Sequence, residues 1–394
     1  MAVADVAADS LAALDTPCLL LDEARLTANV ARMRARLSGL GVAFRPHLKT
    51  AKSLAVARRA MTGPHGPAMV STLREAAYFA EGGVTDLIYG VGIAPQKLDR
   101  VGGIRRQFGA DLAIILDSVA QAEAVAGWVT ANRDPSCAPI CAPLPCLIEV
   151  DADGHRSGVA PDDAATLAAI GRILVDGGAE LRGVLLHAGD SYGLDDPERI
   201  AAAAEAERAA AVVAAGHLRA AGLPCPVVSV GSTPTARFAG DLDGVTEVRA
   251  GVFMFGDLFQ AGIGSCGTDD IALSVLATVI GHQAAKGWII VDAGWMALSR
   301  DRGTARQAVD QGYGIVCDPT GRPYPDLIVR DANQEHGIVA LRPGSRAALP
   351  ELALGARVRI LPNHACATAA QHACYHVLDA SGRVSATWPR IAGW

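Results

Sequence analysis

The sequence predicts an α/β fold in which an eight-fold β/α (TIM) barrel is followed by an antiparallel β domain. Two observations support this fold class. Short β-branched or aliphatic runs alternate with Ala-rich segments of helical period from residue 42 to residue 255, and after about residue 268 strands separated by Gly and Pro turns dominate. With 394 residues, 51% of them hydrophobic, the chain has a length that suggests two or three domains.

The first run with strand character is 16–22, and Asp22 is placed to cap the helix that follows at 23–40. Helices are then predicted over 50–61, 161–176 and 196–221, with others beginning at Leu73 and Ala94. A closed barrel needs eight parallel strands, and eight suitable runs occur. They are residues 42–47, 68–72, 86–90, 111–117, 145–151, 181–189, 226–231 and 247–255.

An open, doubly wound sheet is the alternative to a barrel. That fold normally carries a Gly-rich phosphate-binding turn after its first strand, whereas residues 21–26 read LDEARL. We therefore predict the closed form.

Strand-like runs after residue 268 predict the second domain. We expect the barrel over 22–265 and the β domain over 1–21 and 266–394. A segment at 132–145 that contains Pro and Cys is predicted to be a surface insertion. Turn signals predict hairpins at 318–321 (DPTG) and 379–382 (DASG).

The composition excludes two classes of partner. There are 35 Lys+Arg against 41 Asp+Glu, so the formal net charge of -6 lacks the basic excess that binding to a phosphate backbone uses. No run approaches the ~20 apolar residues that span a bilayer, although the mean hydropathy is +0.25. We expect neither nucleic acid nor membrane as a partner.

The amino terminus predicts a cytoplasmic protein. Its first 24 residues hold no Lys or Arg and carry Asp5, Asp9 and Asp15, so they cannot form the basic region of a secretory signal. The nine Cys are scattered along the chain rather than set in a dense disulfide framework, and we expect reduced thiols.

Lys49 stands just after the first barrel strand, at the end where barrel enzymes gather their active sites. Burial and a neighbouring cation such as Arg45 or His47 would lower the pKa of its amine, as a Schiff-base lysine requires. Lys49 is therefore a candidate for covalent attachment of a carbonyl compound. A solvated lysine at the barrel rim is the alternative.

Gly231, Ser232 and Thr233 follow the strand at 226–231. Small residues with free backbone N–H groups and hydroxyls at a strand end suit a phosphate group, although an ordinary turn is the alternative. Together with Lys49, the turn points to pyridoxal phosphate, which has both a phosphate and a carbonyl.

Two further strand ends carry charged or aromatic groups. Arg156 follows Glu149 and a Gly turn, from which its guanidinium could reach the barrel mouth or form a rim ion pair. His187 ends the next strand, and Tyr192 after it offers a ring for stacking or a phenol for hydrogen bonding.

His364 and Cys366 are two positions apart in LPNHACAT, a spacing that on a strand puts both side chains on one face. Imidazole and thiolate suit Zn²⁺, and water or substrate would complete the coordination, as in a catalytic site. A chance occurrence of this short pattern is the alternative. His372, Cys374 and His376 are competing ligands.

These motifs together resemble the D-serine dehydratase-like branch of the fold type III pyridoxal-phosphate enzymes, which includes D-threonine aldolase, D-threo-3-hydroxyaspartate dehydratase and the β-hydroxyaspartate aldolases. The resemblance runs from about residue 15 to the end and implies a barrel of the alanine-racemase type. It rests on the segments TPCLLLD, RPHLKTAKS, HAGDSYG, VGSTPT, RAGVFMFGD, DAGWMALSRDRGT and LPNHACAT.

The resemblance implies a role for each matched residue. It places covalent attachment of pyridoxal 5'-phosphate at Lys49, phosphate binding at Gly231, Ser232 and Thr233, and an arginine facing the cofactor ring at Arg156. One departure is Asp190, which stands where the family motif has a histidine. Further cofactor contacts are implied for His187 and Tyr192, and metal binding for His364 and Cys366.

The second metal ligand separates the reactions of the family, because its dehydratases carry His-x-Cys and its threonine aldolases His-x-Asp. The resemblance therefore implies a lyase, a PLP- and metal-dependent dehydratase that converts a D-3-hydroxy amino acid (D-serine, D-threonine or D-threo-3-hydroxyaspartate) into a 2-oxo acid and ammonia. Residues 292–304 are most similar to the hydroxyaspartate dehydratase group. The alternative is an aldolase that releases glycine and an aldehyde. A racemase would need a second base, such as Tyr313, Tyr324 or Tyr375, and would have no use for a metal pair.

In this mechanism Lys49 removes the α-proton and the metal polarises the β-hydroxyl. The metal is expected to be Zn²⁺, with Mg²⁺ or Mn²⁺ as alternatives. The family also implies a homodimer. A second substrate carboxylate could be received by Arg45, Arg156, Arg300 or Arg302.

Overall fold

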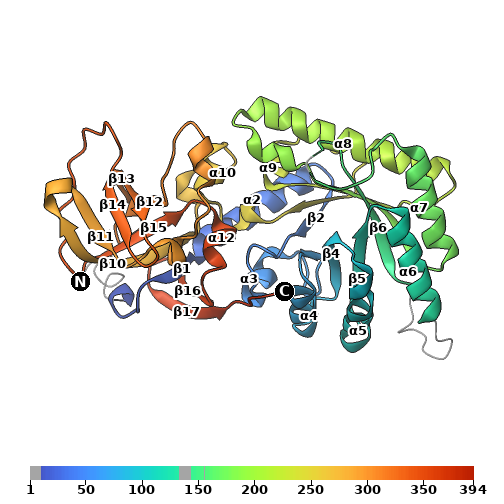
Figure 1. The fold of residues 1–394 in the computed structure, drawn as a ribbon, viewed down its shortest axis with the longest axis horizontal. Helices are drawn as coiled ribbons and strands as arrows, with labels where there is room; N and C mark the ends of the chain where they lie inside the picture. The colour runs from blue at the N-terminus through green and yellow to red at the C-terminus, as the bar shows by residue number, and fades with distance from the viewer. Residues whose placement is uncertain (1–9, 133–142, 155) are drawn as a thin grey trace. The chain divides into compact units, whose positions relative to one another are not determined.

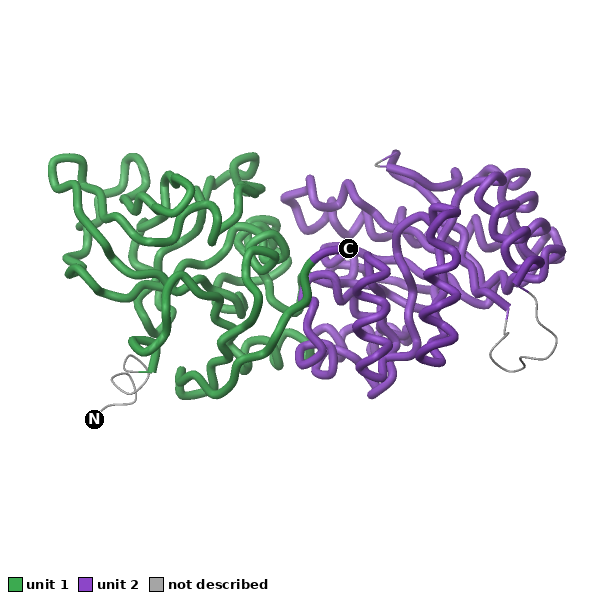
Figure 2. The backbone as a smooth tube through the Cα atoms, turned by 60° about the horizontal axis from the view of Figure 1, so that its bottom comes forward, with its two compact units in different colours: residues 1–31, 252–392 green, residues 32–251, 393–394 purple. Residues whose placement is uncertain are grey.

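The computed structural model describes residues 10–132, 143–154 and 156–394, so 133–142 of the predicted surface insertion lie outside the described residues. Two compact units, coloured separately in Figure 2, divide the chain at 31/32 and 251/252, and residues 393–394 belong to the unit of residues 32–251. The sequence places these borders at 21/22 and 265/266. At the first border the difference arises because helix α2 (Glu23–Gly39) crosses it. At the second border, residues after Val252 form hydrogen bonds within the β unit; for example, Phe259 N–H donates to Asn363 O at 3.1 Å.

The unit that contains residues 32–251 is built on an eight-stranded sheet in the order β2-β9-β8-β7-β6-β5-β4-β3, parallel throughout. The first and last strands in this order, β2 and β3, are joined by a bridge between His47 and Met69. At this bridge Leu48 N–H donates to Met69 O at 2.8 Å. The predicted closed barrel is confirmed. Its strands are β2 (Ala43–Pro46), β3 (Ala68–Val70), β4 (Asp86–Gly92), β5 (Asp111–Leu116), β6 (Pro145–Val150), β7 (Glu180–Leu186), β8 (Val227–Val230) and β9 (Glu247–Ala250).

Helices follow the barrel strands and surround the sheet (Figure 1). Side-chain caps begin several of them, among them Thr72 and Ser118, each of which accepts a hydrogen bond from a backbone N–H of the first turn. The helices are α3 (Leu54–Ala60), α4 (Leu73–Glu81), α5 (Leu98–Phe108), α6 (Val119–Ala131), α7 (Ala164–Asp176), α8 (Pro197–Ala220) and α9 (Thr233–Phe238).

Several elements differ from their predicted bounds, among them one helix and one strand. The helix expected from about residue 50 begins only at Leu54, because Lys52 has a φ of 48° and Ser53 is extended. The last strand, expected to reach residue 255, ends at Ala250 and is followed by a 3-10 turn. Apolar periodicity marks such segments but does not locate their ends.

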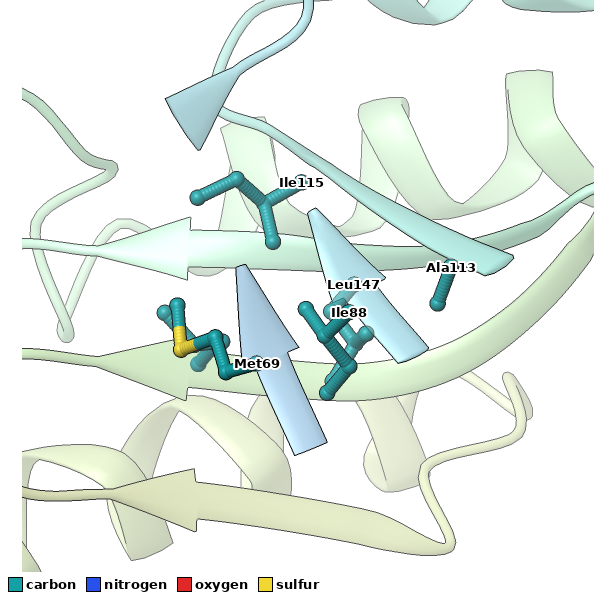
Figure 3. Close-up of a cluster of buried hydrophobic side chains, with 6 residues drawn as sticks. Met69, Ile88, Ala113, Ile115 and Leu147 are labelled. Carbon is teal, nitrogen blue, oxygen red and sulfur yellow. The ribbon is translucent and has the colours of Figure 1, made fainter. Parts of the chain in front are cut away.

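Strands β3 to β7 fill part of the barrel with a buried apolar cluster (Figure 3). Burial of each such large side chain contributes about 1.5–3 kcal/mol relative to exposure. Strands β2, β9 and β8 instead carry a polar network of the half-buried Arg45 and the buried Ser229, Glu247 and Arg249. The apolar cluster comprises Met69, Ile88, Ala113, Ile115, Leu147 and Leu185.

The other unit contains a nine-stranded sheet, in which β10 also pairs with β11 so that six of the strands close on themselves. The pairs are antiparallel except for β1 and β16, and both predicted hairpins are present, between β12 and β13 and between β16 and β17. The strands are β1 (Cys18–Asp22), β10 (Leu273–Gln283), β11 (Trp288–Val291), β12 (Gly314–Cys317), β13 (Pro323–Ala332), β14 (Gly337–Leu341), β15 (Arg357–Pro362), β16 (Cys374–Leu378) and β17 (Val384–Pro389), with short helices α10 (Leu258–Gly262), α11 (Trp295–Leu298) and α12 (Ala365–Ala369).

Among the residues that the structure describes, no helix has the length and the apolar character needed to cross a membrane.

Candidate active site

The loop after β2 presents Lys49 at the end of the barrel where the parallel strands terminate. Within the described residues the Lys49 amine has no acidic partner, whereas the other lysine of the motif, Lys52, lies 3.2 Å from Glu75 Oε1. Lys49 is therefore the lysine that is available for covalent chemistry. Lys49 is exposed rather than buried, which differs from the sequence expectation.

Arg45, which the sequence offered as a cation close to Lys49, forms two ion pairs with carboxylates. Its Nε donates to Glu247 Oε2 at 2.9 Å, and its Nη1 donates to Asp86 Oδ1 at 2.6 Å. Two carboxylates thus neutralise its charge. This engagement also removes Arg45 from the arginines that could receive a substrate carboxylate.

His47 and His187 are imidazoles of the same barrel site. Burial, reinforced by nearby cations that include Lys49 and Arg249, holds the pKa of His47 well below its usual range. Burial also lowers the pKa of His187 to about 3, although the hydrogen bond between His187 Nδ1 and Gly231 O (2.9 Å) opposes the shift. Both rings are neutral at pH 7 and can pack against an aromatic cofactor. The Tyr192 ring lies with its centroid 6.3 Å from that of His187.

The turn at Gly231 requires glycine, because φ is 133° and a Cβ would lie 2.2 Å from Arg249 O. The expectation of free N–H groups is wrong for Gly231 and Ser232. Gly231 N–H donates to Glu207 Oε1 at 2.9 Å, and Ser232 N–H donates to Thr235 Oγ1 at 3.0 Å as part of a capping box for α9.

Glu207 was missed by sequence reasoning. It lies in the middle of α8, is buried, and accepts hydrogen bonds at Oε1 from Ala188 N–H (3.0 Å) and Gly231 N–H (2.9 Å). Burial raises the pKa of its carboxyl, whereas hydrogen bonds from Thr235 and the two N–H groups oppose the rise. Glu207 thereby joins the loops after β7 and β8. Within an Ala-rich helix, its charge was the only local signal.

Arg156 lies 3.7 Å from Glu149 Oε1, so the structure contains the rim ion pair that the sequence left as the alternative. Its side chain is 51% exposed, which leaves it accessible to a ligand. A second arginine, Arg249 on β9, was missed. It is buried, donates to Ser229 Oγ (2.6 Å) and Leu186 O (2.7 Å), and has a pKa lowered to about 10 by burial.

In the β unit, His364 and Cys366 lie at a strand-to-helix junction rather than on one strand. His364 stands at the N-cap position of α12 without a side-chain capping bond, and Cys366 belongs to the first turn. The two side chains are nevertheless joined by a hydrogen bond. Asp257 holds this helix in place, since its Oδ2 accepts from Ala365 N–H at 2.8 Å.

Asp301 was also missed by sequence reasoning. Its Oδ2 lies 2.6 Å from His364 Nδ1. Burial alone would lower the pKa of His364, but the hydrogen bonds to Asp301 and Cys366 raise it to about 11. A carboxylate on Nδ1 orients the ring of a metal-binding histidine and leaves Nε2 for the ion.

The competing ligands lie elsewhere. Cys374 Sγ and His376 Nε2 form a separate contact at 4.0 Å, and His372 Nε2 bonds to Ala297 O at 3.0 Å. No group of three or more His, Cys, Asp or Glu side chains in the described part of the chain forms a metal cage. An imidazole and a thiol are ligand types that suit Zn²⁺, so His364 and Cys366 fit a metal ion.

The barrel residues likewise fit pyridoxal phosphate. They supply an amine without an acidic partner in the described residues at Lys49, a hydroxyl-bearing turn at 232–233 and the neutral ring of His187. The residues that could hold each group are therefore present on the unit to which the sequence analysis assigned them.

Comparison with known proteins identifies the family. Residues 21–258, more than half of the chain, match the family model "Alanine racemase, N-terminal domain". The chain belongs to this family, the fold type III pyridoxal-phosphate enzymes. Residues 272–378 match a second model, "Putative serine dehydratase domain".

Relatives of this fold type III enzyme are similar over its whole length. It is 55% identical to D-threo-3-hydroxyaspartate dehydratase of Delftia sp. strain HT23, over 98% of this chain and 100% of the relative. A solved structure of that dehydratase has a TM-score of 0.91 and 54% identity, over 98% of this chain and 100% of the other. D-threonine aldolase of Arthrobacter sp. is 30% identical, over 90% of this chain and 87% of the relative. The predictions of the family and of a lyase are confirmed.

Two variants of that dehydratase have also been solved. A histidine is replaced by alanine in one and a cysteine two positions later in the other, which is in the metal-free form. His364 and Cys366 have the same order and spacing.

Proposed function

We propose that this chain is a dehydratase of D-3-hydroxy amino acids that uses pyridoxal 5'-phosphate and a divalent metal ion, with D-threo-3-hydroxyaspartate as its substrate. The observation that carries the proposal is the His364–Cys366 pair. It is hydrogen-bonded, is oriented by Asp301 at 2.6 Å, and occurs in a chain 55% identical to a dehydratase of that substrate. From the sequence and the resemblance we also propose that the enzyme is cytoplasmic and forms a homodimer.

The barrel residues would hold the cofactor and move the first proton. Lys49 would attach the cofactor covalently and then act as the base at the α-carbon. Ser232 and Thr233 would bind the phosphate next to Gly231, while His187, Tyr192 and Arg156 would contact the rest of the cofactor. Pyridoxal phosphate, when bound, withdraws electrons from the α-carbon of an amino acid attached to it.

The β unit would supply the side chains that bind the metal ion. His364 Nε2 and the Cys366 thiolate are soft ligands that favour Zn²⁺ over Mg²⁺ or Mn²⁺, which prefer oxygen. Dehydration requires removal of the α-proton and departure of the hydroxyl group, and a divalent cation helps the hydroxyl group to leave. Asp301 would hold the His364 ring for this task.

Product analysis tests the proposed reaction. Loss of water from D-threo-3-hydroxyaspartate gives an enamine, whose hydrolysis takes up water and yields oxaloacetate and ammonia. We expect these products, faster turnover than with D-serine, and loss of both activities after treatment with a chelator. Glycine with glyoxylate would instead establish an aldolase, and full activity in a metal-depleted sample would contradict the metal role.

Replacing Asp301 with Asn is expected to weaken metal binding about 10- to 100-fold, because Asn still accepts a hydrogen bond but loses the charge that makes His364 a better ligand. Competition with a chelating dye measures the metal Kd. Asp310→Asn is the matched control. Asp310 is another carboxylate of the β unit, and it pairs with Arg302 at 2.7 Å. Equal affinities in both variants would show that Asp301 does not support the ion.

A further inference from the structure

The loop that carries Lys49 contains a second lysine whose surroundings differ. Lys52 Nζ lies 3.2 Å from Glu75 Oε1, and Glu75 is completely buried at the start of α4. The pair is an ion pair by distance rather than a well-aligned hydrogen bond, since Oε1 has no hydrogen-bond donor in the described residues. A buried carboxylate is costly without a nearby cation, so Lys52 and Glu75 depend on each other.

Glu75 also connects this loop to the neighbouring strand end. Its Oε2 accepts a hydrogen bond from Ser71 N–H at 2.9 Å, directly after β3. The hydroxyl of the same Ser71 lies 2.9 Å from His47 Nε2. The turn at 71–75 therefore holds the lysine loop on both sides of Lys49, through His47 before it and Lys52 after it.

The backbone of the loop requires such support. Lys52 has a φ of 48°, a left-handed conformation that non-glycine residues adopt only when the surroundings impose it. Its N–H donates to Leu48 O at 2.8 Å, which closes a tight turn around Lys49. The ion pair with Glu75 keeps the side chain of the strained residue in one place.

We propose that Lys52 and Glu75 are positioning residues that fix the turn 48–52, so that the amine of Lys49 is held at one angle to the cofactor. This inference deepens the proposed function and rests on its assignment of Lys49. Neither residue needs to touch the cofactor or the substrate. What they determine is the orientation of Lys49, which lies between His47 and Lys52.

The experiment compares Lys52→Met, Glu75→Gln and the double variant with the wild-type holoenzyme. We expect each single variant to lower kcat at least about 10-fold with less than a threefold change in KM, and to reduce the visible circular dichroism band of the bound cofactor. The double variant should lose no more than the worse single variant, because both changes break one pair. Lys52→Arg, which keeps the charge, should restore most of the band.

Two controls separate positioning from stability. Val125→Ala removes part of a fully buried side chain in α6 and should lower Tm while leaving the dichroism per bound cofactor unchanged. Arg199→Met removes an exposed arginine of α8 that lies 3.9 Å from Asp195, and it should change neither property. If Lys52→Met fails to fold, Glu75→Gln decides the question, because it preserves the size of the buried side chain.

Wild-type dichroism and kcat in Lys52→Met and Glu75→Gln would overturn the proposal. So would variants that lower Tm as Val125→Ala does and leave the dichroism unchanged. Failure of the proposed function is a separate result, since it would be seen as retained cofactor absorbance and turnover in Lys49→Ala.

Discussion

Replacing Lys49 with Ala is expected to abolish the visible absorbance of the lysine-bound cofactor and to lower kcat by about 10³-fold or more, because the variant loses both the attachment point and the base. The structure supports this assignment, since of the two lysines in the motif only Lys52 is paired with a carboxylate among the described residues. Absorbance spectra of the purified protein with added pyridoxal phosphate and steady-state kinetics measure the two effects.

Lys286→Ala is the matched control for this change. Lys286 is exposed in the β unit, where its amine lies 4.4 Å from the centroid of the Trp288 ring. We expect wild-type spectra and turnover from the control. A Lys49→Ala protein that kept both colour and activity would end the assignment of Lys49.

Replacing Cys366 or His364 with Ala is expected to remove the bound metal and to lower kcat by about 10²- to 10³-fold, which corresponds to the several kcal/mol that a metal ion contributes to a leaving hydroxyl. The cofactor absorbance should remain, because the residues proposed to bind the cofactor are on the other unit. Elemental analysis of the protein, together with product assays before and after addition of Zn²⁺, tests this expectation.

Cys374→Ala provides the control for the metal ligands. Cys374 is part of the other Cys and His contact in the β unit, 4.0 Å from His376. The control should keep a full complement of metal. Loss of metal from Cys374→Ala with retention in Cys366→Ala would move the site to the competing pair.

The sequence by itself determined the architecture and the principal candidates. Alternating strand and helix patterns were sufficient for the barrel, because a buried parallel strand and an amphipathic helix each leave a local periodicity. Lys49, the turn at 231–233 and the His364–Cys366 spacing were also readable, since each is a short motif within a few residues.

Tertiary structure alone decided how these residues are supported. Asp301 reaches His364 from a distant part of the chain, and Glu207 bonds to two loops through backbone N–H groups. The tertiary structure also showed that Arg45 forms ion pairs with Glu247 and Asp86, and that Lys52 forms one with Glu75. The physical reason is that a charged side chain finds its partner through space. Hydrophobic periodicity records which face of a segment is buried, but it carries no information about which distant carboxylate completes an ion pair.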